Sequence, residues 1–216
     1  MSFDYDASIP FSPSPNHVPT YGDFLYWLGL FVDKGEYALI FADNRTPYQL
    51  IKVANLDLTD GDANYDLSEF IEDNWKRNIE GLVKVHSFTK CIATPQLKKT
   101  FFDKIRESGA KVRPLMQILD MDTGDEMAMW VMEKVAFVGL SHPDLSREEM
   151  IDRVASAAYN IGTRTGYVLT DLKPQNYGFR NDGSAIIFDF NPDMMADSVQ
   201  LADYKKMITL ASNTKV

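Results

Sequence analysis

Four polar residues near the C-terminal end have types and spacing that suit phosphate and metal chemistry. Asp171 and Asn176 lie five residues apart in one loop, and Asp189 follows a short apolar strand. Carboxylate and amide oxygens are ligands for Mg²⁺, usually together with the phosphate oxygens of a nucleotide. Lys173 is placed to neutralise charge on a transferring phosphoryl group. The alternative is that Asp171 and Asn176 only form a turn beside a proline, and for the Asn-Asp-Gly segment 181–183 a plain hairpin turn is our interpretation.

These residues carry a resemblance to protein kinases. Residues 170–176, TDLKPQN, resemble the kinase catalytic loop H-R-D-L-x-x-x-N in its Ser/Thr-type form, and Asp189-Phe190-Asn191 lies where that family has D-F-G. The resemblance implies that Asp171 accepts the proton of a substrate hydroxyl. It also implies that Asn176 and Asp189 hold Mg²⁺ on the phosphates of ATP.

Two upstream segments extend the resemblance to the nucleotide. MAMWVMEKV (127–135) resembles the strand that enters the hinge between kinase lobes. Met132 would line the back of the adenine pocket, and backbone groups of Glu133 and Val135 would bind the adenine edge. DKGEYALIFA, which begins at residue 33, resembles the glycine-rich loop; it keeps Gly35 but has aspartate and alanine at other glycine positions.

A lysine from the N-terminal region should hold the nucleotide phosphates. Lys52 in QLIKVAN matches the strand lysine of V-A-I-K, and Lys84 is the alternative. Two helices compete to supply the acidic partner of this lysine. By connectivity we prefer the helix at 95–108, with 54–94 as an insertion, over the helix at 66–79. The preferred helix offers Asp103 or Glu107, and the other helix offers Glu69 or Glu72.

The C-terminal side departs from the family pattern. Leu169-Thr170 replaces H-R before the catalytic aspartate, so no arginine stands there to meet a phosphorylated loop. Only 27 residues follow Asp189, and no A-P-E segment is present. The resemblance spans about residues 35–191. With these departures, the chain is similar to the truncated kinases that some bacteriophages encode and some bacterial pathogens secrete.

Periodicity and turn signals predict an α+β chain, with a kinase-like two-lobed fold and a reduced C-terminal lobe by resemblance. We expect an irregular arm at 1–19, an N-lobe at 20–135 and a reduced C-lobe at 136–216. The predicted helices cover 20–32, 66–79, 95–108, 146–161 and 197–210. The predicted strands cover 36–43, 48–55 and 82–93, followed by a β-hairpin across 112–135.

Composition limits the partners. The net charge of −9 argues against binding of nucleic acid, which needs a basic surface. No apolar run is long enough to span a bilayer, so no membrane partner is expected. A single cysteine, Cys91, fits a reducing cytoplasm, which would be the host cytoplasm for a phage or pathogen protein.

The expected activity is ATP- and Mg²⁺-dependent phosphoryl transfer to a protein Ser or Thr. The alternatives are a pseudokinase that binds a partner protein, or a kinase-like transferase that acts on a small molecule or transfers AMP. The sequence does not decide the oligomeric state.

Overall fold

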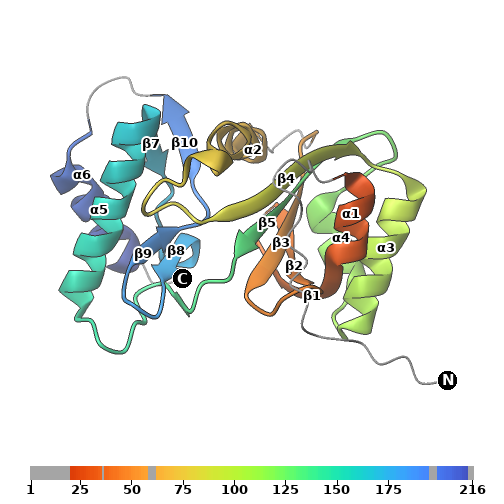
Figure 1. The fold of residues 1–216 in the computed structure, drawn as a ribbon, viewed down its shortest axis with the longest axis horizontal. Helices are drawn as coiled ribbons and strands as arrows, with labels where there is room; N and C mark the ends of the chain where they lie inside the picture. The colour runs from red at the N-terminus through yellow and green to blue at the C-terminus, as the bar shows by residue number, and fades with distance from the viewer. Residues whose placement is uncertain (1–19, 36, 58–61, 195–198, 214–216) are drawn as a thin grey trace.

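The computed structural model describes residues 20–35, 37–57, 62–194 and 199–213, so the predicted arm at 1–19 lies outside the described residues. The chain is α+β, as predicted. Its N-terminal part (residues 20–133) is built on one antiparallel sheet, and its C-terminal part (residues 137–213) is mainly helical with short strands (Figure 1).

The sheet of the N-terminal part has five antiparallel strands in the order β1-β2-β3-β5-β4. The strands are β1 (Leu28–Lys34), β2 (Ala38–Asp43), β3 (Gln49–Asn55), β4 (Val85–Ile92) and β5 (Glu126–Glu133). The predicted strands at 36–43, 48–55 and 82–93 are therefore confirmed. Side chains alternate between the faces of a strand, so Ile51 and Val53 lie on one face of β3 and Lys52 and Ala54 on the other.

Three helices cover the Ile51 face of the sheet, and the side chains between these helices and the sheet form a separate hydrophobic core. They are α1 (Tyr21–Trp27), α3 (Pro95–Glu107) and α4 (Val112–Leu119). The Thr94 hydroxyl caps α3 by accepting the N–H of Leu97, as the Thr-Pro start predicts. The predicted first strand of the hairpin at 112–135 is wrong, because this segment is α4. Its apolar residues recur at helical spacing, and that stripe packs into the core: Val112, Leu115, Met116 and Leu119.

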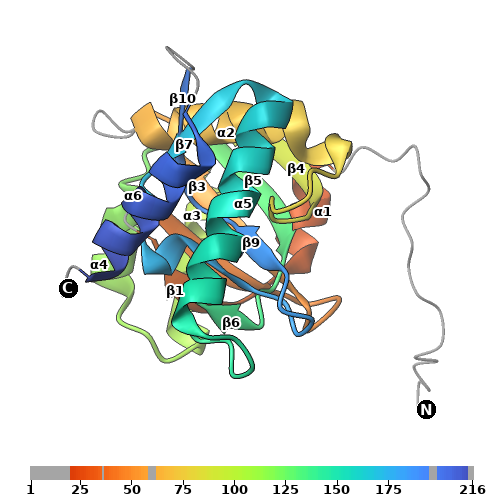
Figure 2. The same cartoon turned by 90° about the vertical axis from the view of Figure 1, so that its left-hand side faces the viewer.

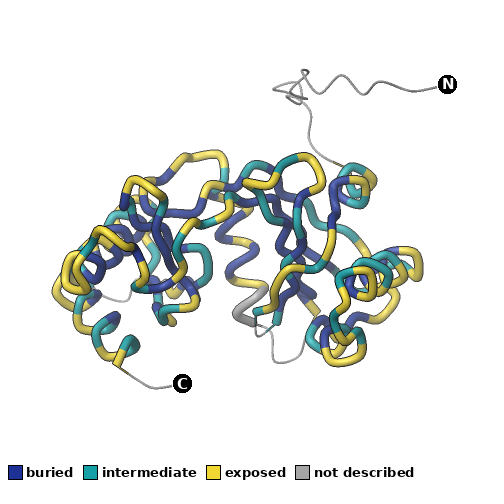
Figure 3. The backbone as a smooth tube through the Cα atoms, turned by 90° about the horizontal axis from the view of Figure 1, so that it is seen from below, coloured by how far each residue is buried: buried dark blue, intermediate teal, exposed yellow. Residues whose placement is uncertain are grey.

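The other face of the sheet packs against α2 (Asp62–Asn74), which is followed by the short 3₁₀ helix η1 (Trp75–Arg77). Phe70 of α2 meets Phe190 of the C-terminal part edge to face, with ring centroids 5.0 Å apart. One hydrophobic core therefore runs through both parts, and buried residues continue from the sheet into the helical part (Figure 3).

In the C-terminal part, α5 (Arg147–Thr165) and α6 (Leu201–Asn213) lie side by side (Figure 2). Ser146 and Glu149 form the capping box that starts α5. The short strands pair as β7 (Tyr167–Thr170) with β10 (Asn191–Met194), and as β6 (Phe137–Val138) with β8 (Tyr177–Phe179) and β9 (Ala185–Ile187). The turn at 181–183 joins β8 to β9, as predicted.

A loop between η1 and β4 fixes the two parts to each other. The N–H of Val83 donates to the carbonyl of Ile187 at 2.9 Å, and the N–H of Ile187 donates to the carbonyl of Gly81 at 2.8 Å. Gly81 has φ +89° and lies so close to α5 that a β-carbon would stand 2.6 Å from the Ala157 Cβ. No helix among the described residues combines the length and apolarity that a membrane crossing requires.

We predict that Gly81→Ala lowers the free energy of unfolding by about 2–5 kcal/mol, because the positive φ and the overlap with Ala157 both oppose a methyl group. Gly109→Ala is the matched control. Gly109 has φ +81°, and a β-carbon built on it would have no atom within 4 Å, so only the backbone cost of about 1–2 kcal/mol applies. Urea unfolding measures the free energy of unfolding of both variants. Equal losses in the two variants would contradict the close contact between Gly81 and Ala157.

Candidate functional site

The pairing of β7 with β10 brings the predicted catalytic loop beside the segment that follows Asp189. Thr170, the last residue of β7, is the register partner of Asn191, the first residue of β10. The Thr170 hydroxyl lies 3.2 Å from both the Asn191 carbonyl and the Asp193 carboxylate. The loop that begins at Asp171 therefore starts next to the chain that leaves Asp189.

Asp171 is exposed and has the left-handed backbone conformation, with φ +57°. Aspartate tolerates this conformation better than most residues. Its Oδ2 accepts a hydrogen bond from Asn176 Nδ2 at 3.0 Å and forms an ion pair with Lys173 Nζ, also at 3.0 Å. The carboxylate is thus held from two sides while remaining open to solvent.

Asn176 is buried at the end of the 3₁₀ helix η2 (Pro174–Asn176) and connects the two aspartates. Its Nδ2 also donates to the Asp171 carbonyl at 2.8 Å. Its own carbonyl accepts the N–H groups of Phe188 and Asp189, at 3.0 and 3.2 Å. The side-chain oxygen of Asn176 has no hydrogen-bond partner among the described residues, so it is free to accept from, or ligate, another group.

Lys52 extends from the sheet to Asp189. Its Nζ lies 2.8 Å from Asp189 Oδ1, and its side chain is only 4% exposed, whereas that of Asp189 is 34% exposed. The ammonium also lies 5.4 Å from the centre of the Trp130 ring. A cation at this depth requires a partner, and the Asp189 carboxylate provides it.

Gly35, the residue after β1, lies near the same carboxylate. A β-carbon built on Gly35 would stand 3.9 Å from Asp189 Oδ2, and the Gly35 N–H donates to the Ala38 carbonyl. Gly35 has neither a positive φ nor a tight contact, so the backbone geometry does not require glycine there.

The preference for the helix at 95–108 as the source of the acidic partner is wrong. This helix, α3, packs on the Ile51 face of the sheet, opposite Lys52. Asp103 instead pairs with Lys99 and Arg106, and Glu107 pairs with Lys104.

The helix on the Lys52 face is α2, which directly follows β3. The segment 54–94, predicted as an insertion, contains α2 and the sheet strand β4. Its candidate acids are engaged elsewhere: Glu72 binds Lys90 at 2.8 Å, and Glu69 lies beside Tyr65 and raises the pKa of that phenol.

The remaining predicted nucleotide residues lie around the end of β5. Met132 is buried on the Lys52 face. The backbone N–H of Glu133 donates to the Lys84 carbonyl at 2.9 Å, so this particular group is not open for adenine. Val135 is half-buried and packs against Gly178, while Lys84 is exposed and makes no contact with Asp189.

Two buried contacts that the sequence analysis did not identify hold this site. The Tyr204 hydroxyl of α6 accepts the N–H of Leu169 at 3.2 Å, shortly before the chain reaches Asp171. Phe190, next to Asp189, is fixed by its edge-to-face contact with Phe70 of α2. Only the aromatic residues Phe70 and Tyr204, which lie on faces of the helices α2 and α6, could have indicated these roles.

The oxygen atoms of Asn176 and Asp189 suit a hard cation whose other ligands are water or phosphate oxygens. The described residues contain no group of three His, Cys, Asp or Glu side chains arranged for a metal ion. Mg²⁺ does not need one, because it commonly takes one or two protein oxygens together with water and phosphate. The open Asn176 amide oxygen and the half-buried Asp189 carboxylate fit that requirement.

We predict that Asp189→Ala lowers the free energy of unfolding by about 1–3 kcal/mol, since it leaves the Lys52 ammonium buried without a counter-ion. Adding Lys52→Met to this variant removes the unpaired charge and should recover most of the loss. Denaturant unfolding of the two single variants and the double variant measures the coupling. Strictly additive losses would mean that the ion pair is absent in solution.

The sequence was also compared with protein-family models and with curated proteins. The sequence matches no protein-family model and no curated protein. What the structure adds is the geometry that brings Lys52, Asp171, Asn176 and Asp189 together.

Proposed function

We propose that the chain is an ATP- and Mg²⁺-dependent phosphotransferase with a kinase-like two-lobed fold and a reduced C-terminal lobe. Its substrate would be a Ser or Thr hydroxyl of a protein. One observation carries the proposal. The strand lysine Lys52, the loop residues Asp171 and Asn176, and Asp189 come from separate segments, yet they form one continuous network.

The arrangement of the elements supports the two-lobed interpretation. The sheet brings Lys52 to the boundary with the helical part, and α2 packs on the same face of the sheet. The chain then passes from β5 directly into the C-terminal part, which supplies Asp171, Asn176 and Asp189. Lys52 thus comes from the sheet on one side of this boundary, and Asp171, Asn176 and Asp189 come from the helical part on the other side. Figure 1 shows the sheet and the helical part side by side.

The Lys52 face also offers an apolar surface for a base. Ile40 is the register partner of Lys52, and Leu50 lies two residues from it and opposite Met132. Ile40 and Leu50 are only partly buried. An apolar platform next to a fixed cation suits a ligand with a flat ring at one end and phosphates at the other.

The chain's own residues would divide the reaction between them. Lys52 would bind phosphate oxygens of ATP, and Asp189 and Asn176 would hold the metal. Bound Mg²⁺ would supply charge neutralisation of the phosphates. Asp171 would orient the acceptor hydroxyl and take its proton as the hydroxyl oxygen bonds to the γ-phosphorus and the bond to ADP breaks. Lys173 would stabilise the charge on the transferred group.

The first test is nucleotide binding. Mg²⁺-ATP should raise the melting temperature of the wild-type chain, because a ligand of the folded state stabilises it. Lys52→Met should reduce the affinity for ATP about tenfold or more, through loss of a charge-assisted contact to phosphate. Lys84→Met is the matched control and should bind like wild type. Titration calorimetry measures the ATP affinity of each variant. Loss of binding in Lys84→Met alone would mean that Lys84, rather than Lys52, binds the phosphates.

The second test is turnover. Asp171→Asn should lower phosphate transfer by about 10²–10⁴-fold, because it removes the base. Stability should change by no more than about 1 kcal/mol, since asparagine also adopts the left-handed conformation and the ion pair with Lys173 is exposed. Asp122→Asn, at a side chain that is 92% exposed, should leave both unchanged.

The assay uses ATP labelled at the α- or γ-phosphate, with protein and small-molecule acceptors. Transfer of the γ-label to protein supports the proposal, whereas transfer of the α-label would indicate AMP transfer. An Asp171→Asn variant that melts normally and transfers phosphate at the wild-type rate would refute the assigned role.

A further inference from the structure

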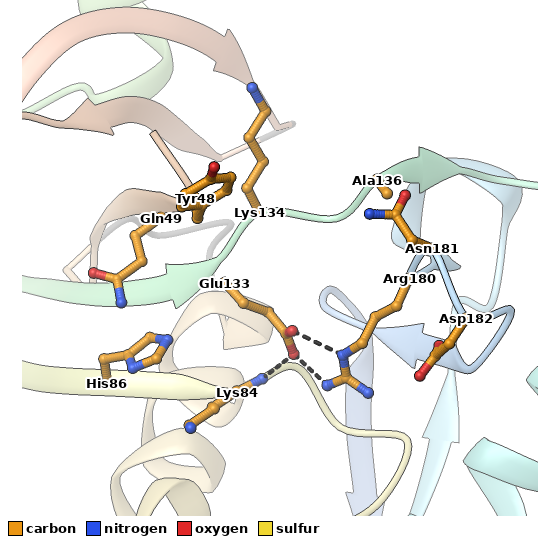
Figure 4. Close-up of a pocket in the computed structure, with 10 residues that line it drawn as sticks. All are labelled: Tyr48, Gln49, Lys84, His86, Glu133, Lys134, Ala136, Arg180, Asn181 and Asp182. Atoms are coloured by element: carbon orange, nitrogen blue, oxygen red, sulfur yellow. Dashed lines mark hydrogen bonds and ion pairs between the residues drawn. The ribbon is translucent and has the colours of Figure 1, made fainter. Parts of the chain in front are cut away.

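A pocket of about 480 Å³ lies away from the proposed catalytic residues, where both parts of the chain meet at the end of β5 (Figure 4). Its walls come from the β2–β3 connection, β4, the chain that leaves β5, and the β8–β9 turn. Lys52, Asp171, Asn176 and Asp189 do not line it. An occupant would therefore contact both parts of the chain without entering the phosphotransfer site.

A β-bulge directs one side chain into this pocket. Val85 pairs with Met132, but Ser87 pairs with Val131, so His86 is the extra residue between them. A bulge turns the side chain of the extra residue out of the regular alternation of the strand. His86 faces Gln49 across the end of β5 in Figure 4. The backbone irregularity thus contributes a polar group to the wall.

Several neutral polar groups of the wall are open. The side chains of Gln49, His86 and Asn181 have no hydrogen-bond partner among the described residues. Burial, with the nearby Lys84 ammonium, lowers the pKa of His86, so its ring is neutral near pH 7 and offers one donor and one acceptor. Two carboxamides and a neutral imidazole match the alternating N–H and C=O groups of a peptide backbone.

The charges of the wall favour an acidic ligand. Glu133 and Arg180 neutralise each other through bonds of 2.9 and 2.6 Å. Lys84 and Lys134 lie on different segments, and neither has a carboxylate partner in the described part of the chain. Asp182 is the opposing charge, and its carboxylate accepts two hydrogen bonds from Ser184. The wall is therefore net positive on a chain whose net charge is −9.

A second pocket shares one lining residue with the first. It has a volume of about 550 Å³ and lies between α5 and the start of β9, and Arg180 lines both pockets. Small residues, which include Gly81, Ala157 and Ala185, line part of it. Its charged lining residues, Glu80, Asp152, Arg153 and Arg180, balance one another, so the positive charge belongs to the first pocket. Two hollows that share one wall suit an extended ligand better than a single compact molecule. The polar walls also disfavour an apolar ligand.

We propose that this pair of pockets is a docking groove for an acidic peptide segment of a partner protein. The Lys84 and Lys134 side chains point to opposite sides of the pocket in Figure 4. The segment would therefore place one acidic side chain beside Lys84 and a second beside Lys134, with its backbone against Gln49, His86 and Asn181. It would run past Arg180 toward α5. The inference does not depend on the phosphotransferase proposal, because its residues and its readout are separate from catalysis.

The test is selection of random dodecapeptides displayed on phage, on the wild-type chain and on the double variant Lys84→Glu/Lys134→Glu. Peptides enriched on the wild type should contain more Asp and Glu than the starting library. As synthetic peptides they should bind the double variant at least about tenfold more weakly, the effect of losing two exposed ion pairs. Lys111→Glu/Lys206→Glu, at two exposed lysines outside both pockets, is the matched charge control and should bind like wild type.

Nuclear magnetic resonance of the ¹⁵N-labelled chain locates the bound peptide. Saturable shifts at Gln49, His86 and Asn181 support the groove. Failure to enrich any peptide, equal binding to the double variant, or shifts elsewhere would overturn the proposal. Succinate that displaces the peptide at equal concentration would also overturn it, since the site would then recognise only a small anion. The lysines are exposed, and matching melting temperatures confirm that all variants are folded.

Discussion

The candidate site depends on the position of Asn176. Its side chain binds both the backbone and the carboxylate of Asp171, and its backbone carbonyl binds the N–H groups of Phe188 and Asp189. One buried residue, through its side chain and its backbone carbonyl, therefore links two aspartates that are 18 positions apart in the chain. Breaking hydrogen bonds of a buried group costs free energy, so these bonds hold Asp171 and Asp189 in one relative position.

Packing then carries this geometry into the rest of the fold. Phe190 is locked against Phe70 of α2, and Leu169 is tied to Tyr204 of α6. The sheet that supplies Lys52 is backed on its far face by a separate core under α1, α3 and α4. Lys52 is thus presented from a sheet that is packed on both sides, and a rigid support is what accurate placement of a charged group requires.

The sequence predicted those elements whose signal is local. The strand hairpin at 36–55, the caps of α3 and α5, and the loop around Asp171 follow from alternation, capping residues and motif spacing. The segment 112–119 was missed because a short apolar run is easily taken for a strand, although Val112, Leu115, Met116 and Leu119 recur at helical spacing and pack into one core.

The choice between α2 and α3 failed for a related reason. Both helices are amphipathic, and sequence order does not say which face of the sheet each one covers. The contacts of Thr170 with Asp193 and of Phe70 with Phe190 could not be predicted either, because each joins segments that are distant in the chain.

The Lys52–Asp189 pair shows why such a site differs from ordinary core. Burying an ammonium costs free energy that a single carboxylate only partly offsets, and a methionine of similar volume would serve packing equally well. Asp189 keeps a third of its side chain exposed, so the pair is open on one side. In the proposed site, this fixed cation and accessible carboxylate would bind an anionic ligand together with its metal. On that proposal, the charge of Lys52 serves binding rather than folding.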